Sequence, residues 1–193
     1  MRRDAEVIYR GHCGKNSLAP QIWCFACGGI YVTCLAAAPG MAQLALTLYI
    51  LAVLIGVFSL DALYRIIPLC HVVALAAIGA IALLQIDIRE ALVRLTGAFF
   101  TMAALALVRW SYARLRRRAG LGWGDVKLVG AGALWVDPIY LGPWLLLATL
   151  SAFASLAFLR WQGVTITRET SIPFGPHLAC GLWIVWLAQI SQF

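Results

Sequence analysis

Two of the eight acidic residues stand out, because each lies at the expected end of a helix and adjoins apolar sequence. Asp61 closes one apolar run in "DALYRIIP", and Asp125 follows alternating glycines in "GLGWGDVKL". A carboxylate beside apolar membrane sequence is costly and usually functional. Two carboxyl groups that meet share one proton, because both cannot ionise comfortably side by side. In such a pair the ionised acid takes a proton from water, while the protonated acid donates to the carbonyl that the water attacks.

The glycines before Asp125 fit this chemistry. Gly120, Gly122 and Gly124 allow backbone conformations closed to other residues and leave space beside the aspartate for a substrate strand. The spacing does not match the dinucleotide-binding glycine motif, which needs another offset and a preceding strand. For each aspartate alone a structural role stays open: Asp61 as an i, i+4 partner of Arg65, and Asp125 as a helix cap.

The composition identifies the elements that must position these acids. The chain is 63% hydrophobic and only 12% charged, which predicts an integral membrane protein. We expect an all-α fold, a polytopic bundle of six transmembrane helices, with a seventh at the N-terminus left open. The six helices are expected within the apolar runs 41–60, 70–86, 91–108, 126–136, 141–159 and 174–190, and the seventh within 22–38.

The first forty residues form a separate unit in this interpretation. We divide the chain into an N-terminal extension, 1–40, and a regular membrane domain, 41–193. The extension is a basic tail with an extra span, an uncleaved signal-like segment, or a stretch before a true start at Met41. Its CxxC, Cys24 and Cys27, with Cys13 and Cys34 nearby, suggests a zinc site. Because Cys24, Cys27 and Cys34 lie in apolar sequence, we favour packing roles and expect no metal and no other cofactor.

Counting the helices sorts the acids by membrane side. Two spans separate Asp61 from Asp125, so both lie on the same face. Asp87 and Glu90 are one crossing from Asp61, and Asp137 is one crossing from Asp125, which places these three on the opposite face. A pair between Asp61 and Asp125 is therefore permitted by topology.

The positive charges orient the bundle. The net charge of +7 is explained by topology and does not require a nucleic-acid partner. If the 109–124 loop lies in the cytoplasm, Arg89 and Arg94 are the only Lys or Arg residues placed on the outer side of the membrane. The inner set is Arg65, Arg109, Arg114, Arg116, Arg117, Arg118, Lys127, Arg160 and Arg168, joined by Arg2, Arg3, Arg10 and Lys15 if the first segment spans. This charge distribution predicts that the acid pair faces the cytoplasm.

The segment after Asp125 is unusually short. The run 126–136 covers only about 17 Å before "DP" interrupts it, so it cannot cross a bilayer alone. Either the preceding glycines dip below the membrane surface or the bilayer thins locally. Gly130 and Gly132 would let a neighbouring helix approach closely.

Three ordered motifs resemble those of a known family. "GWGDVKL" resembles the GxGDxKL motif of the type IV prepilin peptidases, and "DALYRIIP" resembles the segment around their other catalytic aspartate. "IPFGPHLACG", residues 172–181, is similar to PFGPxLAxG at the start of the family's last helix. The resemblance implies an intramembrane aspartic peptidase that removes the basic leader from prepilins or pseudopilins at the cytoplasmic face of the inner membrane.

The motifs assign residues to this activity. The resemblance makes Asp61 and Asp125 the catalytic pair and implies that six further residues shape the site: Gly122, Gly124, Lys127, Pro173, Gly175 and Pro176. The length of the chain is similar to that of the short peptidase-only branch associated with Flp/Tad pili. The single CxxC argues against N-methyltransferase activity. We interpret His71 and His177 as interfacial residues rather than proton relays, and the oligomeric state is left open.

Two other functions use similar sequences. A proton-coupled small transporter also carries intramembrane acids, and an inactive scaffold of a pilus or secretion assembly would keep the fold. Transport is disfavoured because no acid lies near the middle of a span. The scaffold is disfavoured because both Asp61 and Asp125 are present.

Overall fold

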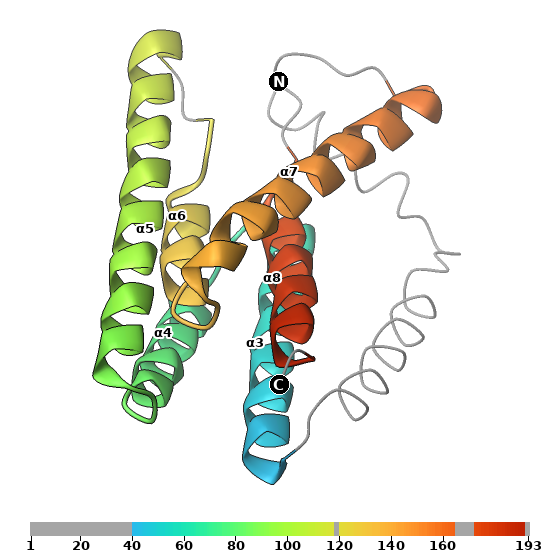
Figure 1. Ribbon diagram of the computed structural model, residues 1–193. Helices are drawn as coiled ribbons and strands as arrows, with labels where there is room; N and C mark the ends of the chain where they lie inside the picture. Colours follow the sequence, from blue (N-terminus) through green and yellow to red (C-terminus); the bar gives the residue numbers. More distant parts are fainter. Residues whose placement is uncertain (1–39, 118–119, 165–171, 192–193) are drawn as a thin grey trace.

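The computed structural model describes residues 40–117, 120–164 and 172–191, and these form helices joined by short connections (Figure 1). The all-α prediction is confirmed, since the described part of the chain contains no strand. The predicted N-terminal extension and the CxxC lie outside the described residues. The helices are α3 (Met41–Tyr64), α4 (Leu69–Leu83), α5 (Ile88–Arg116), α6 (Trp123–Gly132), α7 (Pro138–Trp161) and α8 (Gly175–Ile190).

The helices differ in their capacity to cross a membrane. α3, α5 and α7 are each long and apolar enough to span it, whereas α4 and α8 are shorter apolar helices. α6 has ten residues and a length of about 15 Å, so it lies outside the spanning set. This agrees with the expectation that the segment after Asp125 cannot cross a bilayer by itself.

One predicted boundary is wrong. The segment 109–124 was expected to be a loop, but α5 continues as a helix to Arg116. Arginine is a good helix former, and Arg114 and Arg116 in the last turn interact favourably with the C-terminal end of the helix dipole. Arg117 then ends α5 in the left-handed conformation.

The bundle contains two groups of helices that share a common core. α8 packs against α3 and α7, while α6 packs against α4 and α5 (Figure 1). Trp144 of α7 is fully buried, and its indole N–H donates to the Leu178 carbonyl of α8 at 2.9 Å. A Cβ on Gly132 or Gly181 would lie within 3 Å of the Trp144 ring, so these glycines allow the close approach of helices.

The direction of each helix places particular residues at the two ends of the bundle. The end of α3 and the starts of α6 and α8 lie together at the upper end in Figure 1. The connection between α6 and α7 and the start of α5 lie at the lower end. Asp61 and Asp125 therefore share one end, and Glu90 and Asp137 share the other, as the count of crossings predicts.

Candidate active site

Asp61 lies in the last turn of α3 and contacts the start of α8. Its side chain is only 6% exposed, and its Oδ2 accepts a hydrogen bond from the Gly175 N–H at 2.9 Å. The first N–H groups of a helix lack partners within the helix and favour a negative charge, so this end of α8 suits a carboxylate. A Cβ on residue 175 would lie 2.6 Å from Asp61 Oδ2, so only glycine lets the backbone come this close.

Asp125 lies in the first turn of α6. Gly122 is the N-cap residue, and the Asp125 Oδ2 reaches back to accept the Gly122 N–H at 3.1 Å. Asp125 therefore contributes to capping from the third helical position, as the acidic residue of a capping box does, and not as the N-cap itself. Its side chain is buried at the base of the glycine-rich segment.

Both aspartates line one cavity of about 400 Å³. The other residues around this cavity come from the end of α3, the middle of α7, the segment before α6 and the segment before α8. They are Arg65, Gly120, Leu121, Gly122, Thr149, Ile172, Pro173 and Phe174. The cavity has the size of a small-molecule or peptide-binding pocket.

The two acids influence one another. The pKa of Asp125 is raised to about 6: burial is the largest cause and the charge of Asp61 adds to it, while the Gly122 N–H and Arg109 act in the opposite direction. Arg109 lies on α5, with its guanidinium 4.8 Å from the ring centre of Trp123. A carboxyl with this pKa holds or releases a proton near neutral pH, as acid–base chemistry requires.

The other predicted site residues differ in whether they reach the cavity. Gly122 and Pro173 line the cavity, and Gly175 contacts Asp61. Pro176 is buried behind Gly175, and a Cβ on Gly124 would lie 3.0 Å from Ile67, so these two pack beside the cavity. Lys127 is exposed on α6 and is not among the residues around the cavity.

The two described histidines have other partners. His177 Nδ1 lies 2.9 Å from the Ser151 hydroxyl, which links the start of α8 to α7. His71 Nδ1 lies 3.3 Å from Cys70 Sγ, and the His71 ring packs against Gly56 of α3. Neither histidine lines the cavity. Across residues 40–117, 120–164 and 172–191 no three His, Cys, Asp or Glu side chains are grouped as metal ligands.

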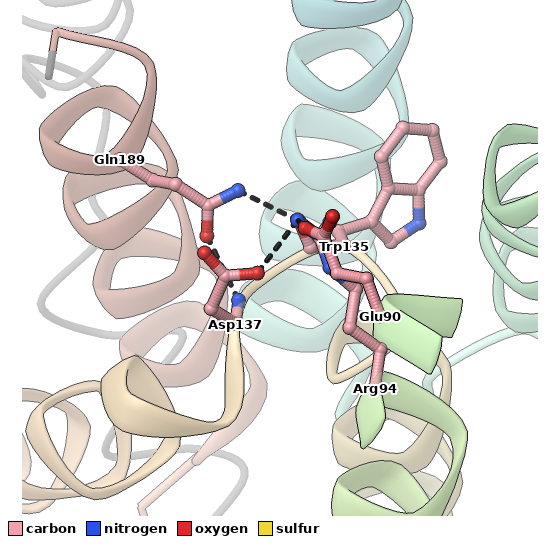
Figure 2. A network of polar contacts seen from close by, with 5 residues as sticks. All are labelled: Glu90, Arg94, Trp135, Asp137 and Gln189. Carbon is pink, nitrogen blue, oxygen red and sulfur yellow. Dashed lines mark hydrogen bonds and ion pairs between the residues drawn. The ribbon is translucent and has the colours of Figure 1, made fainter. Parts of the chain in front are cut away.

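A second polar network lies at the opposite end of the bundle (Figure 2). Arg94 forms ion pairs with Glu90 at 2.8 Å and with Asp137 at 2.6 Å. The buried Gln189 accepts the Asp137 N–H at 2.8 Å and donates to the Trp135 carbonyl. The network joins α5, α8 and the connection between α6 and α7. None of its residues lines either of the two cavities characterised in the described residues.

Sequence reasoning did not find all of the cavity residues. Thr149 and Phe174 lie in apolar helices or short connections and carry no motif that marks them. Tyr112 was also missed; its ring packs against Gly120, which lines the cavity. The cation–aromatic contact of Arg109 could have been suspected only from the excess of Arg and Trp near Asp125.

The chain is similar in sequence to a known protein family. The profile described as the type IV leader peptidase family matches residues 48–160, which include both aspartates. The chain belongs to this family. The match covers most of the helical bundle, and with its long apolar helices the chain is a bacterial membrane protein.

Curated relatives carry related names. A prepilin leader peptidase/N-methyltransferase of Dichelobacter nodosus is 29% identical over 72% of this chain and 48% of its own length. The Pseudomonas aeruginosa protein of the same name is 32% identical, with the same coverage of each chain. Leader peptidase HopD of Escherichia coli is 31% identical over 47% of this chain and 59% of its own length. The chain thus spans about half the length of these relatives, and no solved structure matches it.

Proposed function

We propose that this protein is an aspartic endopeptidase that removes the leader peptide from type IV or Flp-type prepilins. The observation that carries the proposal is the meeting of two buried aspartates, from α3 and α6, in one cavity. The relatives named for prepilin leader cleavage support the substrate class. The excess of Lys and Arg on the cavity side of the helices supports a cytoplasmic site in the inner membrane.

In the proposed reaction Asp61 and Asp125 share one proton. The ionised acid removes a proton from a water molecule in the cavity, and the protonated acid donates to the oxygen of the peptide carbonyl. The amide bond then breaks after proton transfer to the leaving nitrogen. Neither a covalent intermediate nor a metal ion enters these steps.

The surrounding residues orient the acids. The Gly175 and Gly122 N–H groups each hold one carboxylate oxygen, so each aspartate keeps a fixed direction towards the cavity. Pro173 and Gly122 form part of the wall beside which the leader would lie. A buried acid held by a backbone N–H is well suited to catalysis, because little reorganisation is needed during reaction.

Leader removal is tested most directly in membranes. The protein is co-expressed with candidate prepilins from the same genome, and their masses are measured before and after incubation. We expect a loss equal to the leader, abolished by Asp61→Asn or Asp125→Asn and unaffected by inhibitors of serine, cysteine or metallo-peptidases. Asp137→Asn, the same change at the opposite end, serves as the matched control and should still cleave. Processing by either site variant would contradict the acid pair.

A further inference from the structure

An apolar groove of about 340 Å³ runs between α5 and α7. The two helices meet near Gly97 and Pro138 and diverge towards the end of the bundle that holds the acids (Figure 1). The groove follows one face of each helix. Its walls include Phe100, Ala104 and Val108 of α5, spaced by one turn, and Leu141, Gly142 and Leu145 of α7.

The groove leads to the aspartate cavity along both helices. One turn beyond Leu145 on α7 is Thr149, which lines the cavity. One turn beyond Val108 on α5 is Tyr112, whose ring packs against Gly120, and Gly120 also lines the cavity. A helical turn of four residues rises about 6 Å, so the groove and the cavity are consecutive hollows on one side of the bundle.

Small residues in the groove are left open to a partner. A Cβ on Gly132, Gly181 or Gly97 would meet a neighbouring side chain, so those glycines serve packing within the bundle. A Cβ on Gly142 would meet nothing within 4 Å, and Ala104 is exposed. Helices associate within lipid mainly through close packing at small residues, so Gly142 and Ala104 suit an incoming helix.

We propose that this groove binds an apolar helix of the membrane-anchored substrate and holds the adjoining scissile bond in the aspartate cavity. This inference rests on the proposed function. It identifies the groove as the surface that selects substrates. The occupant is a polypeptide helix because the groove continues into a cavity built for a peptide bond. The part of the substrate that lies in the groove is apolar, since the lining is formed by Phe, Leu, Val, Ala, Gly and one Thr, Thr101.

Two neighbouring alanines give a matched test. Ala104→Phe fills the groove, whereas Ala103→Phe adds the same ring at the next exposed position of α5, outside the groove lining. Two substrates carry the same prepilin junction. One continues into an alanine–leucine helix of about 20 residues in phosphatidylethanolamine–phosphatidylglycerol vesicles, and the other is the soluble junction peptide alone.

We expect Ala104→Phe to lower kcat/KM for the anchored substrate roughly tenfold, mainly through KM, and to leave the soluble peptide unaffected. Ala103→Phe should match the wild type with both substrates. The proposal is overturned if the two variants cleave the anchored substrate equally well. It is also overturned if Ala104→Phe impairs both substrates to the same extent, because the loss would then not depend on the helix.

A binding measurement separates this inference from the cleavage reaction. A photo-crosslinking residue is placed at position 104 or 103 in the Asp125→Asn background, where the substrate stays intact. An adduct with the anchored peptide from position 104 but not 103 supports the groove, even if the wild type cleaves neither substrate and the proposed function fails. Adducts with lipid alone from position 104 would overturn docking, whatever the cleavage result.

Discussion

At one end of the bundle Asp61 and Asp125 face a cavity, while at the other end Asp137 is tied into a closed network. Asp61 and Asp125 each accept a hydrogen bond from the N–H of a glycine, Gly175 and Gly122. Asp137 instead lies 2.6 Å from the Arg94 guanidinium, and its N–H is bound by Gln189.

The comparison shows two uses of an acid within an apolar bundle. An arginine in direct contact neutralises a carboxylate, as Arg94 of α5 does for Asp137, and Gln189 ties the same connection to α8. Asp125 instead shares a cavity with a second acid, and its pKa of about 6 suits proton transfer more than stability. Exchanging or removing the features that distinguish the two ends tests this contrast.

The largest effect is expected at the acid pair. Asp61→Asn or Asp125→Asn removes one member of the shared-proton system, and cleavage should fall by about 10²-fold to 10⁴-fold or beyond detection. Asp137→Asn should retain cleavage per folded molecule. Rates on one prepilin, normalised to folded protein by gel filtration in detergent, measure the difference. Comparable losses in all three variants would remove the functional distinction between the ends.

The next effect concerns the contact of Asp61 with α8. In Gly175→Ala the new methyl group would lie 2.6 Å from Asp61 Oδ2, so the carboxylate must move, and we expect a loss of roughly tenfold to a hundredfold in kcat. Gly181→Ala on the same helix is the control, because its methyl group meets Trp144. That variant should lose thermal stability and keep its rate per folded molecule. The opposite pattern would show that Gly175 serves packing only.

The pH dependence of stability should report the burial of Asp125. Its pKa is about 6 in the folded protein against 3.8 ordinarily, so the folded state binds the proton more tightly. The wild type should therefore lose up to about 3 kcal/mol of unfolding free energy relative to Asp125→Asn as pH rises from about 4 to 6. Unfolding of both proteins in the same detergent at several pH values checks this. A difference that does not change with pH would count against a buried, raised pKa.

At the closed end, Arg94→Met should reduce stability without changing the chemistry. It leaves the partly buried Asp137 without its cation, and we expect a loss of about 1–3 kcal/mol, measured by thermal or denaturant unfolding. Arg89→Met, on the exposed side of the same turn, is the control and should be nearly neutral. A large fall in kcat for Arg94→Met at full folding would show that the two ends are coupled.

The smallest effect is expected for Glu90→Gln. Glu90 pairs with Arg94 across one helical turn, but its side chain is 48% exposed, so the change should cost less than about 1 kcal/mol. The same unfolding measurement applies. A loss as large as that of Arg94→Met would mean that Glu90 is as important to the network as Asp137.

Counting apolar segments was sufficient to predict which end of the bundle holds each of four acids, because each crossing reverses the chain. It could place Asp61 with Asp125 and Glu90 with Asp137. It could not predict that Asp61 would contact the Gly175 N–H, which lies 114 residues further along, because that contact depends on how α3 and α8 pack.

Helix ends were harder to predict for a different reason. The end of α5 was placed at the end of the apolar run, but the arginine-rich segment beyond it remains helical to Arg116. A change from apolar to polar residues shows where a helix leaves the apolar region. It does not show where the helix ends. The exposure of Lys127 also shows that one motif can include a residue that lines the cavity, Asp125, and a neighbour that does not.

The short helix α6 is held by hydrogen bonds just beyond its last turn. Its lower end continues into a turn that is bound to α4 through the Trp135 indole N–H and the Leu75 carbonyl, and to α8 through Gln189. Asp125 sits near the other end of this helix, which is about 15 Å long, so a tilt of ~10° about the held turn would carry its carboxyl by ~2–3 Å. A pivot this small changes the separation of two acids by the length of a hydrogen bond.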